Sequence, residues 1–581
     1  MYSNKFKQFR NLIQPLYRVV LGAPRQYIMN ADMSHIHRVA IVGIYLLSLL
    51  VIFLRPLDVQ QWQWADDTMY FNNALAIITN LGEALWMGPF TEVLLAKPQL
   101  YSVFIAFSVG SGIPIRVAEF LIFAPLPFVF LLAVRPLSLP RLPVLYFAML
   151  CLLFIPVAGM ELRLLRTTLF GAFVLYSLIS LTGLLINGVL GRNRSWIWAI
   201  TAGVAVGLAV STRSEGIWLF VPSMFVVLVI AFYSWKKIKT LVLLSAFLLM
   251  VGYQVPINIF SMLNYKSYGT YSPSLRQSDD YKGLYSLLVS LEPETRQKYV
   301  PINEETRYLV YSVSPHFSEL QPFLEGPATD MFAKNAGHHF ISGWGDKLDQ
   351  REFFVSIFEW ALAKSIFLSG RTSAKEFNVF CRDVRNELLS AIREGRISSG
   401  AKGIGLLPPL EVSEYQNVGI ASLKSIRLLF EAKGIDRQYH VKINPDLEVA
   451  QRWNAYLGAW PGLAEGDKHY TDIIFNKVIV VMFQVFYNVI IVTALFCLVF
   501  LIWKDRGKAG IYLSMEIFCI GALMSFSMVM GIVDTVAWPT LNWPKSYNAM
   551  GQFPLHYLLL VSMIIIWRSI YEFRYGKVKM T

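Results

Sequence analysis

Two adjacent carboxylates, Asp66 and Asp67, stand just beyond the first long apolar run of the chain. Aromatic residues flank them at Trp62, Trp64, Tyr70 and Phe71. A positioned carboxylate can act as a general base, and two neighbouring carboxylates raise each other's pKa, which favours base action near neutral pH. Either Asp could instead cap a helix that continues from Thr68. Because consecutive helical residues point about 100° apart, we expect only one of the two to face a cleft, and the sequence does not say which.

The composition around this pair is that of a membrane protein. Of the 581 residues, 55% are apolar and only 16% are charged, against about 25% charged residues in a soluble domain. The mean hydropathy is +0.47. The net charge of +13 comes from basic residues that cluster in short segments between apolar runs, a pattern typical of membrane topology and not of nucleic-acid binding. We therefore expect membrane lipids and no nucleic acid among the partners.

Hydropathy predicts a mainly α, polytopic membrane protein with about ten transmembrane helices. The spans are expected at about 39–54, 114–134, 143–159, 167–189, 196–211, 216–233, 240–260, 472–503, 510–533 and 550–569. Short helices at 68–80 and 98–109 are expected to lie along the membrane surface. The four cysteines form neither a disulfide framework nor a CxxC metal pattern.

Four regions follow from this division of the chain. They are a basic tail at 1–38, a transmembrane core at 39–260 with its first outer loop at 55–113, a polar region at 261–471, and C-terminal transmembrane helices with a basic tail at 472–581. The polar region is too long for a loop and has the size of a domain. Residues 353–396 in it have the pattern of helices.

The distribution of basic residues predicts the orientation. With the N-terminus inside, the cytoplasmic connections are the tail, 135–141, 191–194, 236–239, 504–508 and the C-terminus, and every one is basic. The outer side then receives the Asp pair, the segments 161–166 and 213–215, and the domain 261–471. The first apolar run lacks a small-residue cleavage site, so we interpret it as a retained span.

Three motifs of this outer side resemble the GT-C glycosyltransferases, most broadly the bacterial aminoarabinose and protein-mannosyl transferases. The motifs are Asp66-Asp67-Thr68-Met69-Tyr70, Lys97-Pro98-Gln99-Leu100-Tyr101 and Thr212-Arg213-Ser214-Glu215-Gly216. Gln99 and Ser214 stand where the family usually has proline, and neither departure removes a titratable group. The resemblance covers about 39–260 and does not explain 261–471.

The resemblance implies an inverting transfer of a sugar from a polyprenyl-phosphate donor to a periplasmic glycan, lipid or protein. It assigns the general base to Asp66 or Asp67 and a substrate-binding role to Tyr70. It leaves open whether a divalent metal takes part, and it implies no other cofactor. It places the chain in a bacterial inner membrane, with both termini cytoplasmic and the large domain periplasmic.

Such a transfer needs fixed positive charge where the leaving phosphate gains negative charge. The candidates on the outer side are Lys97, Arg163, Arg166 and Arg213. Lys97 is preferred because Pro98 fixes its backbone. Arg163 and Arg166 could instead snorkel at a span end, and Arg213 could form a structural ion pair with Glu215.

Four further polar residues are candidates for substrate binding: Glu161, Glu215, His338 and His339. Glu161 could act as a second acid or could simply pair with a neighbouring arginine. His338 and His339 lie in the domain 261–471. Adjacent histidines point apart on any regular element and no further ligand spacing accompanies them, so we predict no metal site there.

Two other functions compete with the transferase: a transporter or flippase, and a non-catalytic cell-envelope assembly protein on the same scaffold. Transport would be favoured by charged residues inside spans, where the sequence offers only Glu119 and Glu516 away from span ends. A nucleotide-sugar enzyme would need a cytoplasmic site, and the cytoplasmic connections are too short to build one.

Overall fold

The computed structural model describes most of the chain. It comprises residues 35–53, 66–80, 82–91, 93–158, 166–234, 239–291, 299–300, 302–337, 351–353, 355–400, 410–430, 470–504, 506–536 and 544–575. Within these ranges helices are the only extended regular elements, and a lone antiparallel bridge joins Leu291 to Ser399. The prediction of a mainly α protein is confirmed.

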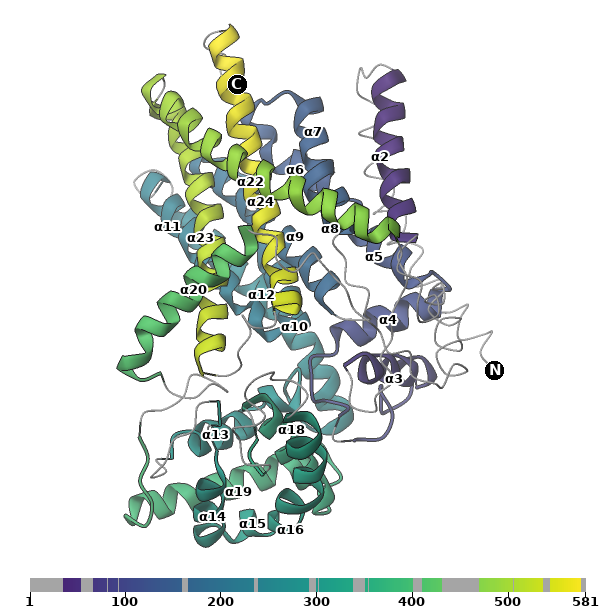
Figure 1. Ribbon diagram of the computed structural model, residues 1–581, viewed down its shortest axis with the longest axis vertical. Helices are drawn as coiled ribbons and strands as arrows, with labels where there is room; N and C mark the ends of the chain where they lie inside the picture. The colour runs from purple at the N-terminus through teal and green to yellow at the C-terminus, as the bar shows by residue number, and fades with distance from the viewer. Residues whose placement is uncertain are drawn as a thin grey trace.

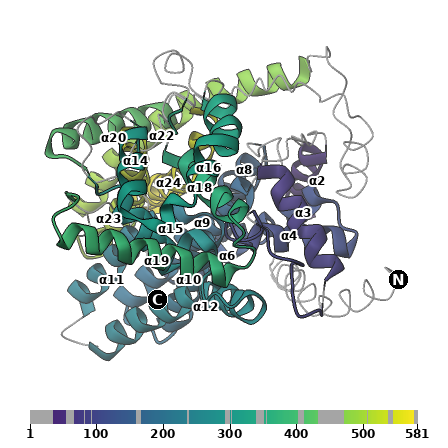
Figure 2. The same cartoon turned by 90° about the horizontal axis from the view of Figure 1, so that it is seen from below.

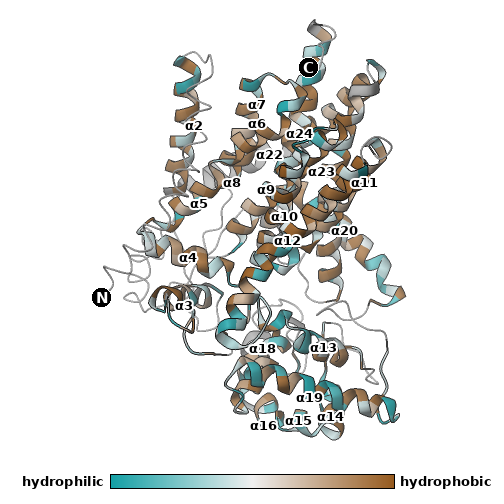
Figure 3. Cartoon of the chain, turned by 180° about the vertical axis from the view of Figure 1, so that it is seen from behind, coloured by the Kyte–Doolittle hydropathy of each residue, from teal (hydrophilic) through white to brown (hydrophobic). Residues whose placement is uncertain are grey.

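Nine helical segments of the described ranges are long and apolar enough to cross a membrane. They are α2 (His35–Phe53), α5 with α6 (Ile115–Phe123 and Leu126–Val134), α9 (Thr167–Val189), α10 (Ser195–Thr212), η3 with α11 (Ser214–Leu219 and Phe220–Ser234), α12 (Lys239–Tyr268), α22 (Tyr470–Lys504), α23 (Arg506–Val536) and α24 (Pro544–Tyr575). Figure 1 shows them gathered in the upper part of the molecule, and Figure 3 shows that hydrophobic residues dominate them. The chain is a multi-pass membrane protein, as predicted.

The span expected at 143–159 has a different form. There α7 (Arg141–Met149) runs into a π-turn, η2 (Leu150–Phe154), and then into the short α8 (Ile155–Ala158). Pro156 has no N–H to donate to the carbonyl four residues earlier, which lies within η2. The apolar helix counted from Arg141 to Phe154 is therefore shorter than the nine long ones.

Close backbone contact joins α10 to α12. A Cβ added to Gly203 would lie 2.1 Å from Leu249 O, and one added to Gly252 would lie 2.6 Å from Ile200 O. Small residues at such positions let membrane helices approach closely and gain packing energy. The contact fixes the end of α10, where Arg213 follows, relative to α12.

Helix α12 continues towards a group of helices below the bundle, which we call the helical domain (residues 275–400). Its elements are η4 (Leu275–Gln277), α13 (Asp279–Leu288), α14 (Glu304–Val313), α15 (Pro315–Ser318), α16 (Gln321–Phe323), η5 (Leu324–Gly337), α18 (Val355–Leu368) and α19 (Ala374–Arg393). Figure 1 shows them clustered at the lower end of the molecule, and in Figure 2, seen from below, they lie in front of the transmembrane helices. Ser373 and Glu376 form a capping box that starts α19.

Two short helices, α3 (Asp66–Thr79) and α4 (Leu100–Ser111), occupy the segments expected at 68–80 and 98–109. Tyr70 of α3 meets Tyr101 of α4 edge to face, with ring centroids 5.2 Å apart. Both belong to one continuous hydrophobic core that also contains Tyr281 and Phe358 of the helical domain. The first loop and the helical domain therefore fold together.

Helix α20 (Tyr415–Phe430) belongs to the region 261–471 but packs against the bundle. Gly531 of α23 faces Val418 and Ser422, and Gly551 of α24 faces Leu429. Part of the predicted outer domain thus returns to the transmembrane helices, as Figure 1 also shows.

Candidate functional site

Asp66 and Lys97 form the centre of the site. Asp66 is the first residue of α3, and Lys97 lies in the connection that leads into α4. The Lys97 ammonium donates a hydrogen bond to Asp66 Oδ1, and the side chains are 14% and 31% exposed, respectively. The structure thus joins the Asp66 carboxylate of the first motif to the Lys97 ammonium of the second.

The backbone around Lys97 is fixed by buried amides. Gln99 Nε2 donates to the carbonyls of Leu94 and Lys97, at 2.5 and 2.6 Å. Asn73 Nδ2 of α3 donates to Gln99 Oε1 at 3.2 Å and to Leu94 O at 3.3 Å. Gln99 thereby ties the Lys97 connection to the helix that carries Asp66.

Burial governs the proton affinity of Lys97. Loss of hydration is the largest influence on its pKa, and the nearby charges of Arg166 and Arg276 act in the same direction. Together they lower the pKa from 10.5 to about 8, against the attraction of Asp66. The ammonium also lies 6.0 Å from the ring centroid of Tyr70 and 5.6 Å from that of Trp360. Lys97 is therefore a cation that gives up its proton more readily than an exposed lysine.

Arg166 stands at the start of α9 and faces the protein. It is only 9% exposed, and its Nη1 donates to Thr212 O at 3.2 Å. This burial argues against the snorkelling alternative. Among the described residues no carboxylate pairs with Arg166, so its charge is available to the site.

Arg213 and Glu215 form the ion pair that the sequence allowed. Arg213 Nη2 lies 3.1 Å from Glu215 Oε1, and Arg213 Nη1 donates to Thr167 Oγ1 at 3.2 Å. The second contact joins the end of α10 to the start of α9. The pair therefore has a structural part, and it also brings two charges beside Tyr70.

Tyr70 is the buried polar group between these charges. It is 1% exposed, and its hydroxyl has no hydrogen-bond partner among the described residues. Burial raises its pKa; Arg166 and Arg213 act in the opposite direction, while Asp66 and Glu215 add to the increase. Asp66 and Tyr70 of the first motif therefore lie within electrostatic reach of Arg213 and Glu215 of the third.

The helical domain contributes three site residues that the sequence did not reveal. Arg276 of η4 pairs with Glu359 of α18 at 2.9 Å, and its guanidinium lies 4.1 Å from the centroid of the Trp360 ring. Burial raises the pKa of Glu359, against the attraction of Arg276 and Lys97. A single acid within the apolar sequence of α18 is a signal that could have indicated Glu359.

Arg276 keeps unused hydrogen-bonding capacity. Its Nε and Nη2 are buried and have no partner among the described residues. The backbone N–H of Leu275 donates to Leu95 O at 2.8 Å, which holds η4 against the Lys97 connection. A buried donor without a partner costs free energy, so a ligand that accepts these N–H groups would be stabilised.

Several predicted residues lie outside the described part of the chain. They are Glu161, Arg163, His338 and His339, and the side chain of Asp67, the second residue of α3. Within the described part, no group of three or more His, Cys, Asp or Glu is arranged to hold a metal ion. No protein-family model, curated protein or solved structure matches the chain.

The described site carries more positive than negative groups. Its cations are Lys97, Arg166, Arg213 and Arg276, and its carboxyls are those of Asp66, Glu215 and Glu359. Such a site can bind an anion such as a phosphate, for which arginine offers paired N–H donors, and can present a carboxylate beside it.

Proposed function

We propose that the chain is an inverting GT-C type glycosyltransferase, which moves a sugar from a polyprenyl-phosphate donor to an acceptor at the outer face of a bacterial inner membrane. The observation that carries this proposal is the Asp66–Lys97 pair set among three arginines. A base and fixed positive charge are the two elements that the transfer requires.

In the proposed reaction the acceptor hydroxyl or amine attacks the anomeric carbon of the donor sugar. The bond from that carbon to the phosphate oxygen breaks, and polyprenyl phosphate leaves with the bonding electrons. The acceptor's proton passes to the carboxylate of Asp66, or of Asp67 if that side chain faces the acceptor. Lys97, Arg166 and Arg276 stabilise the negative charge of the leaving phosphate.

The pairing of Lys97 with Asp66 gives the site a way to respond to the donor. A phosphate that enters beside Lys97 offers the ammonium a second anionic partner. When Lys97 turns to that phosphate, Asp66 loses its hydrogen-bond donor and gains basicity. The donor would thus prepare the base for the acceptor.

The arrangement of the chain supports an outer-face site. The connection between α6 and α7 and the C-terminal end of α24 lie at one end of the molecule, and α3, α4 and the helical domain lie at the other (Figure 1). The first end carries basic connections, including Arg135, Arg141 and Arg192, which favour the cytoplasmic side. We therefore propose that the site and the helical domain are periplasmic.

The released polyprenyl phosphate provides a test that needs no knowledge of the sugar. Permeabilised membranes containing the full chain and endogenous acceptors are given a panel of synthetic polyprenyl-phosphate sugars, and polyprenyl phosphate is quantified. We expect Asp66→Asn or Asp67→Asn to lower its release by about 10²- to 10⁴-fold, as loss of a general base does. Asp280→Asn, which removes an acid of an exposed pair with Arg382, is the control.

The folded state of each variant is checked by its elution from size-exclusion chromatography. Full release in both single variants and in the double variant would overturn the proposal. The proposal would also be overturned if the wild-type chain released polyprenyl phosphate from none of the donors but moved an intact lipid-linked sugar between the leaflets of a liposome. That second outcome would favour a flippase.

A further inference from the structure

A polar recess lies at the end of the bundle opposite the helical domain. It encloses about 390 Å³ and is bordered by the end of α6, by η1 (Arg135–Leu137), by the start of α7 and by the segment after α9. Three arginines, Arg135, Arg141 and Arg192, line it. It shares no residue with the site around Asp66, so it needs an explanation of its own.

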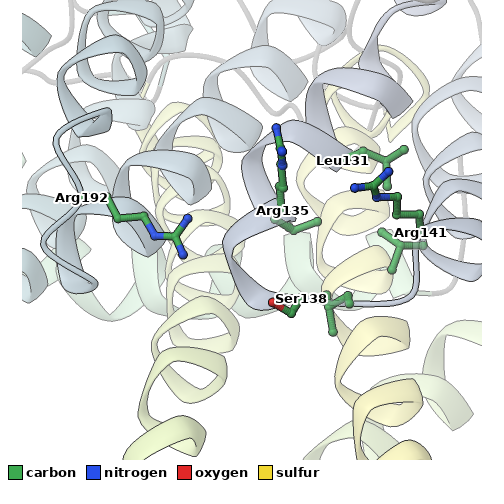
Figure 4. A pocket seen from close by; sticks show the side chains of 8 residues that line it. Leu131, Arg135, Ser138, Arg141 and Arg192 are labelled. Atoms are coloured by element: carbon green, nitrogen blue, oxygen red, sulfur yellow. The ribbon is translucent and has the colours of Figure 1, made fainter. Parts of the chain in front are cut away.

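The three arginines approach the recess from three different elements. Figure 4 shows the guanidinium groups of Arg141 and Arg192 directed towards Arg135 from opposite sides. All three residues are exposed, and none of the residues that line the recess is acidic. The sequence itself has no Asp or Glu from 120 to 160 or from 162 to 214. Positive charge is therefore concentrated in the segments that line the recess.

The backbone between Arg135 and Arg141 is held in a specific turn. Pro136 and Pro140 restrict it, and Ser138 adopts a φ of 52°, in the left-handed region that non-glycine residues rarely enter. The Ser138 N–H donates to Arg135 O at 3.2 Å. Strained backbone of this kind persists where the surrounding structure requires it, often at ligand sites.

Apolar side chains complete the wall of the recess. Leu131 and Val134 come from α6, Leu139 from the turn and Val144 from α7. A ligand that fits this surface has an anionic group for the arginines and an apolar part for the wall. A membrane phospholipid has both, and it lies at the level of the helix ends.

We propose that this recess binds the phosphate headgroup of an anionic membrane phospholipid. Arginine grips phosphate oxygens with paired N–H donors, and basic pockets between transmembrane helices are known to take anionic headgroups. Three guanidinium groups around one recess would favour such a lipid over a zwitterionic one, whose own cation they would repel. The inference is independent of the proposed transferase activity.

Binding is measured directly on the purified full chain. The detergent-solubilised protein is titrated with short-chain phosphatidylglycerol and, separately, phosphatidylcholine, and bound lipid is counted by native mass spectrometry. We expect a preference for phosphatidylglycerol, and a loss of roughly fivefold in its affinity for each pocket arginine removed. Arg135→Gln should therefore weaken it about fivefold, and the triple change Arg135→Gln, Arg141→Gln and Arg192→Gln should abolish the preference.

A matched control removes the same amount of charge outside the recess. It combines Arg38→Gln, Arg194→Gln and Lys239→Gln, three exposed residues, and should leave the preference within about twofold, since charge outside the recess is screened. Equal losses in both triple variants would overturn the proposal in favour of general attraction to anionic lipid. Equally strong competition by glycerol phosphate, which lacks acyl chains, would show a soluble-anion site and overturn the lipid assignment. If the triple variant fails to fold, the single Arg135→Gln decides.

Discussion

Replacing Asp66 with asparagine should deprive Lys97 of the charge that keeps it protonated. Burial opposes the ammonium, Asp66 is the main group that counteracts it, and the balance leaves the pKa of Lys97 at about 8 instead of 10.5. That difference corresponds to about 3 kcal/mol against the charged form, at about 1.36 kcal/mol per pKa unit. The Coulomb attraction between two unit charges about 4 Å apart near a protein surface is on the order of 4 kcal/mol. We therefore expect Asp66→Asn to bring the pKa of Lys97 below about 7.

Competitive acetylation between about pH 6 and 10, followed by peptide mass spectrometry, measures this directly, because only the neutral amine reacts. Exposed Lys375 of α19 serves as the reference lysine in the same digest. Asp280→Asn is the matched control, because it removes a carboxylate that pairs with Arg382 on the surface of the helical domain. A Lys97 midpoint that stays near 8 in Asp66→Asn would refute the reasoning.

The same shift predicts how stability depends on pH. The folded pKa of about 8 lies below the ordinary value of 10.5, so the unfolded chain binds more protons between these two values. The free energy of unfolding should therefore rise with pH across that window, by up to about 3 kcal/mol. Lys97→Met should lack this increase, and the difference in unfolding temperature between the two proteins at each pH checks it. If the unfolding temperatures of the two proteins changed in parallel with pH, the burial of Lys97 would be contradicted.

Gly203→Val should separate α10 from α12, because the added Cβ would lie 2.1 Å from the carbonyl oxygen of Leu249. The unfolding temperature of this variant should therefore fall. Gly521→Ala, where no atom lies within 4 Å of the added Cβ, should keep the unfolding temperature of the wild type. Tyr70→Phe removes a buried hydroxyl without a partner among the described residues, so the free energy of unfolding should stay the same or rise by about 1 kcal/mol. If the hydroxyl binds the donor, release of polyprenyl phosphate should fall about tenfold. Unchanged release would exclude that role. Arg276→Met should lower the free energy of unfolding by about 3 to 5 kcal/mol, because it leaves Glu359 buried and unpaired. Adding Glu359→Leu should recover most of the loss.

The sequence was most informative where a signal is local. Long apolar runs predicted the membrane-spanning helices, and α9 begins and ends at the residues expected for its span, 167 and 189. Pairs within a few residues, such as Arg213 with Glu215, could also be proposed from spacing alone. The exception among the spans is the one at 143–159, where Pro156 interrupts regular hydrogen bonding and a π-turn results.

Contacts between distant segments could not be predicted in this way. Arg276 and Glu359 lie 83 positions apart and come together only because α13 and α18 pack into one core with α3 and α4. The local sequence pattern of α20 does not predict that it packs against α23 either. An amphipathic or apolar pattern indicates that the apolar face of a helix will be buried against another element. It does not indicate which element that is.

The helical domain has a direct effect on the chemistry of the first loop. Leu275 holds η4 to the Lys97 connection, Arg276 repels the Lys97 ammonium, and Trp360 covers it. Displacing the domain would remove part of the burial and all of the repulsion by Arg276, and both of these lower the pKa of Lys97. Lys97 would then return towards an ordinary pKa and remain a firmly charged partner of Asp66. The low proton affinity of Lys97 is therefore a property of the assembled chain, and any chemistry that depends on it requires the helical domain to be in place.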